Sequence, residues 1–597
     1  MENNTNRTAE EILAEEVTND FLRRQEERRI IERGWTLCMN FVNGNQYCDL
    51  DARGELYEEE KKYFWEDRRV FNHIAATVDI RCSKLGRVRP ALTVRAAGEE
   101  ESDRHSAELA SAILASVADE ADLDGIISDA TVWSEICGTA FYKIIWDGLA
   151  GGTLGVTGDG RKVKQGEVSV SAVSPFEIYP YSLTVESVEE QPSIIHARAV
   201  SAQDIYTVYG VKLGGAEKKD GDEYGGIKLK PGYELVIERY ERPDDVRPQG
   251  RFTAVAGGRV LFDGALPYIN GDGGARTFPF VKQVSVARAG SFFGTSVVER
   301  LIPLQRAYNA VKNRKYEFLN RICAGTVAVE DGSVDMDELA EDGLMPGKVI
   351  VYRQGGTPPQ TLSLGTVPAE FFEEEQRLLS EFSKVSGTGE ITENADAFAG
   401  ITSAAGLQII IDQDEIRMDF AYRQIKRALK NIGRQILRLY RQFATEVRLL
   451  KFAGRNGDLS VYYFKGGDIS SDDVFLEADS DANLSPAQRR AMVYEMLDKG
   501  LFSDENGKLT AAAKNKVLEL IGYKGLEGER DLGALNRGRA GEENLIMRTR
   551  EAEVKDYDDH ATHITEHTAF LLTEKLSAEA EDRICRHIQM HRNKENS

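Results

Sequence analysis

The chain has 597 residues and a formal net charge of −23 at pH 7, with 41% hydrophobic and 29% charged residues. This balance is typical of a soluble globular protein with several domains, and no apolar run is long enough to cross a bilayer. The negative charge argues against a protein that grips nucleic acid over much of its surface, because such binding depends on many Lys and Arg contacts to phosphate. We therefore expect only local basic patches.

Residues 1–293 are expected to form an N-terminal helical arm and a β-rich region with helices packed on it. A charged helix is predicted at residues 8–34, and a helical stretch at 102–136 is followed by Gly138. Short apolar runs bounded by Gly, Pro and Asp then predict strands. The expected strands are residues 140–147, 167–173, 193–200, 233–240, 252–255, 260–262 and 280–286.

Residues 294–323 are predicted to form a long amphipathic helix. Thr295 or Ser296 is placed to cap its free amide groups, and Pro303 falls within its early turns. Apolar residues follow one stripe, whereas another face is basic. The bases of interest on that face are Lys312, Arg314, Lys315 and Arg321.

Residues 324–368 break the helical pattern. Glycines and prolines punctuate short β-type runs, which predicts a small β insertion. The runs are residues 326–329, 349–352 and 361–364. A second amphipathic helix is expected at residues 369–386, and Gly387 is expected to stop it.

Residues 387–401 form an acidic segment. No Lys or Arg occurs between Val385 and Ile416, and the Gly-, Ala- and Asn-rich composition cannot build a core of its own. The segment is therefore predicted to be a mobile, negatively charged loop. Its acids are Glu390, Glu393 and Asp396.

Residues 402–483 are expected to hold one very long helix, to about residue 449, and further strands. The helix would span roughly 70 Å, with Gly406 and Gly433 as the expected points of bending. Basic side chains step along it by three and four residues. This basic ridge comprises Arg423, Arg427, Lys430, Arg434, Arg438 and Arg441. A solvated face, docking against acids of a neighbouring subunit, and DNA contact are the alternatives, and the acidity of the rest of the chain favours docking.

Residues 484–554 and 555–597 are expected to be helical, and the second range forms a tail in which five of the eight histidines lie. These are His560, His563, His567, His587 and His591. The first three share one helix face and the last two form a pair, which is geometrically able to hold zinc. A packing or inter-subunit role is favoured, so no metal or cofactor is predicted; a metal site and a pH-sensitive contact are the alternatives.

Motifs for catalysis do not stand out. The chain has no G-x-x-x-x-G-K-[ST] run that would wrap a phosphate, no H-E-x-x-H and no G-x-S-x-G. Glu373, Glu374 and Glu375 occupy adjacent helical positions and point apart, which disfavours them as a catalytic pair. We therefore expect neither a motor ATPase nor another enzyme.

The order of the predicted parts resembles the bacteriophage portal family, the head-to-tail connector ring through which DNA enters a capsid. In that family two stem helices flank a clip subdomain, a tunnel loop follows, and a long kinked helix crosses the wing. Short segments are similar as well. They are Phe71-Asn72-His73-Ile74, the proline-flanked stretch from Pro175 to Pro180, Phe278-Pro279-Phe280-Val281 and Glu543-Asn544.

The resemblance implies an α+β, multidomain portal fold that forms rings, with a β-rich wing, an α-helical stem, a small α/β clip, a long kinked wing helix and an α-helical crown. The implied parts are the arm and wing (1–293), first stem helix (294–323), clip (324–368), second stem helix (369–386), tunnel loop (387–401), long wing helix with wing strands (402–483), crown (484–554) and helical tail (555–597).

The implied function is a portal ring, with the family's twelve copies, at a capsid vertex of a virion assembled in the host cytoplasm. It would be the channel for packaging and ejection of double-stranded DNA. Its implied partners are further copies of the chain, major capsid and scaffolding proteins, the terminase packaging motor and head-tail adaptor proteins, with no membrane involved.

Within such a ring, Glu390, Glu393 and Asp396 would approach the lumen. The stem bases would either face the lumen and centre the duplex or form outward salt bridges to stem glutamates. Two other classes of protein stay open from the sequence: a non-portal helical scaffold or adaptor, and an enzyme acting on nucleic acid or cell wall.

Overall fold

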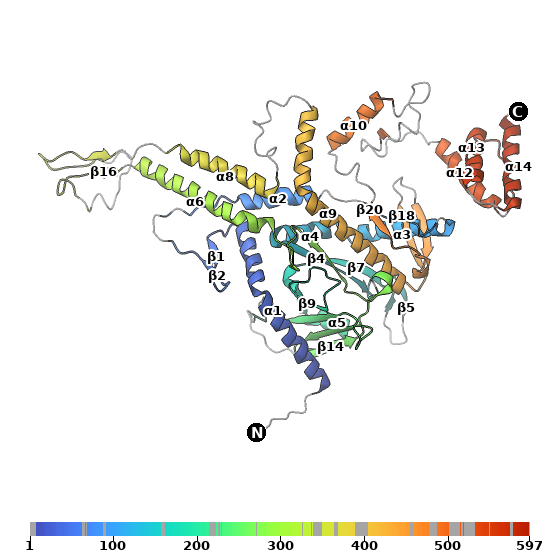
Figure 1. Cartoon of the computed structure of the whole chain (residues 1–597), viewed down its shortest axis with the longest axis horizontal. Coiled ribbons are helices and arrows are strands. Elements are labelled where there is room, and N and C mark those ends of the chain that lie inside the picture. Colours follow the sequence, from blue (N-terminus) through green and yellow to red (C-terminus); the bar gives the residue numbers. More distant parts are fainter. Residues whose placement is uncertain are drawn as a thin grey trace. The chain divides into compact units, whose positions relative to one another are not determined.

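The structure is a computed structural model in which the helices and strands divide into two compact units, Met1–Asp479 and Ser480–Ser597. It describes residues 8–61, 66, 68–86, 91–98, 100–156, 162–213, 223–224, 227–228, 230–269, 271–324, 326–335, 337, 349–362, 368–388, 404–453, 459–476, 486–500, 514, 517–518, 532–548, 550–573 and 577–595. The described part mixes helices and strands, which confirms the α+β class (Figure 1).

The first unit opens with α1 (Ala9–Val42), a helix that continues past the predicted end at residue 34. Thr8 caps it, because the Thr8 hydroxyl accepts from the Glu11 amide and the Glu11 carboxylate accepts from the Thr8 amide. Trp35 and Phe41 are buried on its extension. Burial of these aromatic rings therefore outweighs the helix-weakening Gly34.

Two helices replace the single helical stretch expected at residues 102–136. They are α3 (Glu101–Glu120) and α4 (Leu123–Cys137), separated at Asp122, which has a left-handed backbone with φ 48°. The Asp122 side chain accepts from the Gly125 amide and so caps α4. The shorter α2 (His73–Leu85) precedes them and is capped by Asn72.

Within the described residues, two antiparallel sheets form the β-rich part. One has the order β15-β4-β7 and the other β14-β13-β12-β9-β8. All seven predicted strands of this region are present. Their bounds are β4 (Thr139–Asp147), β7 (Glu167–Val173), β9 (Ser193–Ser201), β12 (Tyr233–Glu241), β13 (Arg251–Ala256), β14 (Arg259–Gly264) and β15 (Phe280–Val284). The short strand β8 (Ile178–Pro180), at one edge of the five-stranded sheet, was not among the predicted strands. The sequence did not predict the short helix α5 (Ala202–Tyr209).

Three further pairs of short strands form separate two-stranded sheets. They are β1 (Cys48–Leu50) with β2 (Leu56–Glu58), β5 (Thr153–Val156) with β6 (Lys162–Lys164), and β10 (Glu223–Tyr224) with β11 (Ile227–Lys228). None of these short strands was among those predicted.

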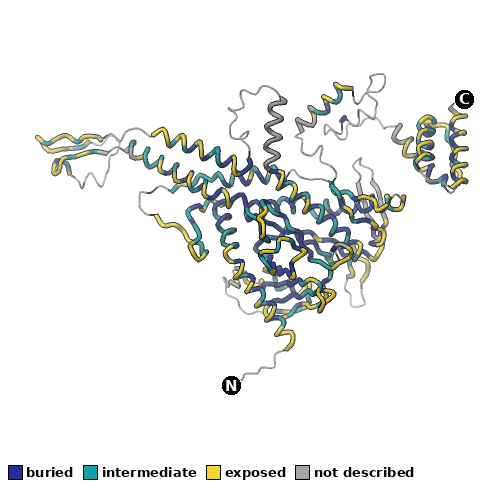
Figure 2. The backbone as a smooth tube through the Cα atoms, viewed as in Figure 1, coloured by how far each residue is buried: buried dark blue, intermediate teal, exposed yellow. Residues whose placement is uncertain are grey.

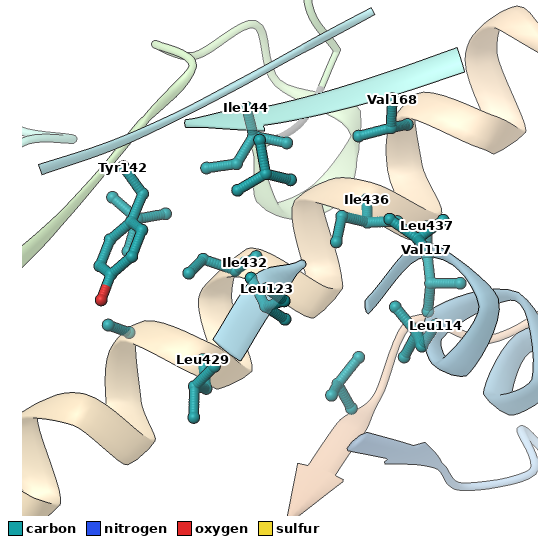
Figure 3. Close-up of a cluster of buried hydrophobic side chains, with 14 of the residues drawn as sticks. Leu114, Val117, Leu123, Tyr142, Ile144, Val168, Leu429, Ile432, Ile436 and Leu437 are labelled. Atoms are coloured by element: carbon teal, nitrogen blue, oxygen red, sulfur yellow. The ribbon is translucent and has the colours of Figure 1, made fainter. Parts of the chain in front are cut away.

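The long helix α9 (Ala404–Phe443) crosses the three-stranded sheet. Figure 3 shows its apolar residues packed with side chains of the sheet and of α3 and α4. The labelled residues include Ile432, Ile436 and Leu437 of α9 and Ile144 and Val168 of the sheet. Burial along this face is why so basic a helix stays fixed to the wing.

The predicted end of α9 at residue 449 is wrong, because strand β18 (Arg448–Ala453) begins there and pairs with β19 (Leu459–Phe464). The helix assignment is continuous through Gly433, an expected bend. A Cβ at Gly433 would meet Val474 Cγ1 at 3.1 Å. Glycine therefore lets β20 (Val474–Leu476), which pairs with β3 (Leu92–Val94), approach the helix closely.

The stem consists of α6 (Val297–Ala324) and α8 (Glu370–Ser386), which run antiparallel and side by side (Figure 1). Ser296 caps α6, since its hydroxyl accepts from the Glu299 amide at 2.9 Å. Gly387, with φ 69°, ends α8 as predicted.

At the far end of the stem, β16 (Thr326–Ala328) pairs with β17 (Gln360–Leu362). The strand predicted at 349–352 is wrong. Val349 and Val351 are 79% and 78% exposed there, so this apolar run packs against no layer within the described residues. Figure 2 shows the same trend, with exposed backbone toward the tip of the stem.

The second unit contains α10 (Pro486–Asp498), α12 (Leu532–Met547), α13 (His560–Thr573) and α14 (Ala578–Glu595). The last three pack on one another around Met547, Ile584 and Ile588. The structure thus groups α12, which the sequence assigned to the crown, with the tail helices. Residues 511–521, within the range 484–554 expected to be helical, lie largely outside the described residues. None of the described helices combines the length and apolar composition that a bilayer crossing needs.

Candidate functional site

The two stem helices meet through apolar side chains at their base. Leu301 and Tyr308 of α6 pack in one buried cluster with Leu378 and Phe382 of α8. Further along, the rings of Phe318 and Phe371 are 6.5 Å apart. The stem is therefore a packed hairpin within one chain rather than two separate arms.

One glutamate connects the basic face of α6 to α8. Lys315 Nζ donates to Glu375 Oε2 at 2.7 Å, Lys312 donates to Glu375 Oε1, and Tyr308 Oη donates to Glu375 Oε1 at 3.3 Å. Burial alone would raise the pKa of Glu375, but the hydrogen bonds and charges of Lys312 and Lys315 hold it below its ordinary value. The structure thus pairs these two bases with a stem glutamate.

The other two predicted stem bases differ from this pair. Arg314 bonds to Glu317 of its own helix at 3.1 Å, and its side chain is 65% exposed. The side chain of Arg321 lies outside the described residues. Arg314 is thus the stem base whose position leaves it most accessible to a partner.

Glu375→Gln is expected to lower the free energy of unfolding by about 1 to 2 kcal/mol at pH 7, because it removes the charge that two lysines share. The pKa of Glu375 is lower in the folded than in the unfolded chain. Its stabilisation is therefore present above the ordinary value of 4.5 and is lost as the pH falls through the folded pKa. In urea titrations between pH 3 and 7, the free energy of unfolding should fall less with decreasing pH in the variant than in the wild type.

The control for this change is Glu373→Gln, at an exposed position of the same helix. It is expected to change stability by less than about 0.5 kcal/mol. Equal losses in the two variants would contradict the role of Glu375.

A buried ion pair between α2 and α4 lies at the base of the stem. Arg81 Nε of α2 donates to Glu135 Oε2 of α4 at 2.5 Å, and Ser285 donates to the other carboxylate oxygen at 2.8 Å. Arg81 also donates to the backbone carbonyl of Ser386, the last residue of α8. Arg81 and Glu135 are 5% and 0% exposed.

The residues just after α8 are held in place as well. Thr388 is 5% exposed, and its amide donates to the Ser386 hydroxyl at 3.1 Å. Ser383 donates to the Thr388 carbonyl at 2.5 Å. The chain is therefore anchored up to the residue at which the acidic segment starts. Glu390, Glu393 and Asp396 themselves lie outside the described residues.

A close approach of two glycines fixes the start of the stem against the sheet. A Cβ on Gly138 would lie 2.6 Å from the Gly294 carbonyl oxygen, and one on Gly294 would lie 2.7 Å from the Gly138 carbonyl oxygen. Gly138 has φ 85°. Only glycine fits both requirements, so the α4–β4 turn and the entry to α6 lie in direct contact.

The basic ridge of α9 divides into two parts. Its last three members contact their own chain: Arg434 lies 3.7 Å from Asp473, Arg438 pairs with Asp472, and Arg441 donates to the Ile469 carbonyl at 3.1 Å. The predicted contact with a neighbouring subunit is therefore left to the other three residues of the ridge, Arg423, Arg427 and Lys430.

Of the remaining three, Arg423 pairs with Asp419 one turn earlier at 2.9 Å, in an exposed pair that contributes little stability. Arg427 is exposed and lines a surface pocket with Lys282 and Glu186. Arg427 and Lys430 are thus the best-placed members of the ridge for contact with another molecule.

A buried charged cluster between the two sheets was not predicted from the sequence. Lys143 Nζ of β4 lies 2.5 Å from Glu238 Oε2 of β12 and 3.1 Å from His196 Nδ1 of β9. Tyr240 donates to the same Glu238 oxygen at 2.8 Å. Burial lowers the pKa of Lys143, whereas Lys143 and His196 outweigh burial and hold the pKa of Glu238 well below its usual range. This cluster joins the sheets electrostatically.

In the second unit, the histidines converge from two helices upon a carboxylate of a third. His563, His567, His587 and His591 are at most 1% exposed. Glu543 of α12 faces them, with Oε2 lying 3.1 Å from His563 Nδ1, 3.7 Å from His567 Nε2 and 3.5 Å from His587 Nε2.

The charge state of this histidine cluster follows from its burial. Burial and the neighbouring histidines lower the pKa of His567 to about 3 and that of His591 to about 4. Burial alone would raise the pKa of Glu543, but His587, His563 and Arg539 bring it down to about 2. At neutral pH the cluster thus combines neutral His567 and His591 imidazoles with a carboxylate.

The sequence brought together only part of this histidine cluster. It predicted that His560, His563 and His567 share one helix face and that His587 and His591 form a pair. The structure places Glu543 at the centre, a residue that the sequence connected only with the crown. A carboxylate 24 positions before His567 in the chain has no local signature that would have revealed it.

The described residues thus contain a paired helical hairpin with a two-stranded tip and a long helix packed on a sheet. Residues 206–472, less than half of the chain, match the family model described as phage P22-like portal protein. This region, which holds the stem, the acidic segment and α9, is therefore that of a bacteriophage portal protein, and the predicted family is confirmed. No curated protein matches the chain.

Proposed function

We propose that the chain is the subunit of a portal ring, with the twelve copies that the family implies, set at a capsid vertex. The ring is the channel for packaging and ejection of double-stranded DNA. The observation that carries the proposal is the stem hairpin continuing into the acidic segment and α9, all within the residues that match the portal family.

The remaining partners follow from this assignment. The exposed apolar residues Val349, Val351 and Tyr352 near the stem tip support a contact surface there. In a portal ring this tip binds the terminase motor during packaging and head-tail adaptor proteins afterwards. Capsid and scaffolding proteins surround the ring during assembly in the host cytoplasm.

Negative-stain microscopy and native mass spectrometry of the purified chain test the ring directly. Twelve chains of 66.4 kDa should give a particle of about 800 kDa with a central hole. A chain that stays monomeric at high concentration would exclude the portal assignment and favour a scaffold or adaptor.

The ring contact is expected to use the accessible half of the basic ridge. Arg427→Glu combined with Lys430→Glu should reduce the ring population at least tenfold in native mass spectrometry, because opposite charges across a subunit contact become like charges. The matched control is Arg242→Glu with Arg247→Glu, which makes the same change in charge at exposed residues of another face. Intact rings in the Arg427→Glu and Lys430→Glu variant would show that the basic ridge is not part of the contact between subunits.

The acidic segment is proposed to form the narrow part of the channel. A channel must let DNA slide, and every phosphate contact that releases a counterion resists sliding. A ring of Glu390, Glu393 and Asp396 would repel the duplex and keep it centred.

Deleting residues 389–399 should leave rings intact, because the buried anchor at Thr388 is kept, but should alter packaged genome length or DNA retention. Genome length is measured by pulsed-field electrophoresis of DNA from particles made with the variant. The control keeps the segment and changes only its charge, with Glu390→Gln, Glu393→Gln and Asp396→Asn. Genomes of normal length and retention in the deletion would count against the channel role.

A further inference from the structure

The buried histidines of the second unit are arranged around a common point. The side chains come from α12 (Glu543), α13 (His567) and α14 (His587 and His591), and their donor atoms all lie within 4.8 Å of one another. His587 Nε2 lies 3.2 Å from His591 Nε2 and 3.5 Å from Glu543 Oε2. Glu543 Oε2 lies 3.7 Å from His567 Nε2.

These separations suit a small transition-metal ion. Ligand bonds of about 2.0 Å in a tetrahedron place neighbouring donor atoms about 3.3 Å apart. Three of the six distances between the donor atoms, 3.2, 3.5 and 3.7 Å, are close to that spacing, and all six are within 4.8 Å. Three imidazoles and one carboxylate are the ligand types of zinc rather than of calcium or magnesium, which take mainly oxygen ligands.

Hydrogen bonds outside the cluster orient two of the imidazoles. His567 Nδ1 lies 2.7 Å from the Asn544 side-chain oxygen, so this nitrogen carries the proton and Nε2 presents its lone pair to the cluster. His591 Nδ1 lies 2.9 Å from His560 Nδ1, which leaves His591 Nε2 on the side of His587. His563 lies 3.1 Å from the Glu543 carboxylate and can donate to it.

Several nitrogens of this cluster are buried without a hydrogen bond. His567 Nε2 is one, and His563 Nε2 and His587 Nδ1 are others. A buried polar atom without a partner costs about 1 to 3 kcal/mol. A cation bound between His567 Nε2 and the neighbouring donor atoms of the cluster would accept the lone pair of this nitrogen.

We propose that Glu543, His567, His587 and His591 bind one zinc ion, or a divalent transition metal of similar preference, in a closed structural site. Four protein ligands leave no open position for a substrate, so the ion joins the three helices rather than performing catalysis. This assignment replaces the face of His560, His563 and His567 suggested by sequence spacing, since only His567 of those three is a ligand.

A second group of possible ligands shares one histidine with this site. It consists of Asp558, His563 and His591. We assign the ion to the first group because it offers four donors, and because His563 Nδ1 is already directed at Glu543. The two assignments make opposite predictions for changes at His563 and His567.

The test uses the untagged full-length chain, stripped with a chelator and then titrated with zinc chloride in a calorimeter. We expect one zinc ion per chain with a dissociation constant below micromolar, and the same ratio by elemental analysis of the reconstituted protein. His567→Ala and His587→Ala should each weaken binding at least a hundredfold. His563→Gln should weaken binding by about tenfold, less than either ligand variant, because His563 only hydrogen-bonds to the ligand Glu543. The exposed His105→Ala should leave binding unchanged.

Cobalt substitution gives a readout that does not depend on the stability of a variant. Tetrahedral Co²⁺ bound to the wild-type chain should show intense visible absorption that zinc displaces. Absence of stoichiometric zinc binding by the wild-type chain would overturn the proposal. Loss of binding in His563→Gln with retention in His567→Ala would overturn this choice of ligands.

Discussion

Lys143→Met is expected to lower the free energy of unfolding by about 3 to 5 kcal/mol at pH 7. The substitution leaves the Glu238 carboxylate, 5% exposed, without the ammonium group that lies 2.5 Å away. Breaking a buried pair by removing one partner is strongly destabilising, because the remaining charge is kept from water. Urea unfolding followed by tryptophan fluorescence and circular dichroism measures the effect.

A second variant separates the stranded charge from lost packing. Lys143→Met combined with Glu238→Gln removes both charges, while the amide oxygen can still accept from Tyr240. It should recover at least about 1 kcal/mol relative to Lys143→Met alone. Lys61→Met, an exposed lysine, should change stability by less than about 0.5 kcal/mol. A loss below 1 kcal/mol in Lys143→Met would show that the charged cluster does not hold the sheets together.

Local patterns were sufficient to predict most elements of this chain. The Ser296 cap and the Gly387 stop depend on residues within one turn of the helix end, so their chemistry is visible in the sequence. Seven of the strands from β4 to β15 were predicted because short apolar runs alternate there with turn residues. The order of stem, acidic segment and long helix was enough to suggest the portal family, which the match over residues 206–472 confirms.

Contacts between distant residues could not be predicted in the same way. Lys143, His196 and Glu238 meet only because three strands of two sheets bring them together. The same holds for Glu375, which satisfies two lysines about 60 positions earlier in the chain. A charged residue in a sequence carries no mark of whether it will be solvated or buried with a partner.

Tertiary packing also moved element boundaries. α1 continues through Trp35 and Phe41 because both are buried, although Gly34 weakens a helix locally. The run at 349–352 has the composition of a strand but no neighbouring strand in the described part of the chain. In both cases the deciding partner lies elsewhere in the chain, or in another molecule.

Arg81→Met is expected to have a similarly large effect, about 3 to 5 kcal/mol, because it leaves Glu135 buried with Ser285 as its remaining hydrogen-bond donor. It also removes the donor that Arg81 offers to the Ser386 carbonyl at the end of α8. The substitution should therefore lower the stability of the whole unit and also loosen the end of α8.

Hydrogen exchange read out by mass spectrometry distinguishes an anchor from a general stabiliser. In Arg81→Met at low denaturant, amides of residues 383–388 should exchange at least tenfold faster than in the wild type, whereas those of the outer half of α6 should change little. Lys282→Met serves as the matched control, because Lys282 is also a basic side chain that donates to backbone carbonyls, in a different part of the wing. Uniform acceleration across both stem helices would mean that Arg81 stabilises the fold without anchoring the acidic segment. Faster exchange confined to the end of α8 would mean that Arg81 of the wing fixes the point at which the acidic segment begins.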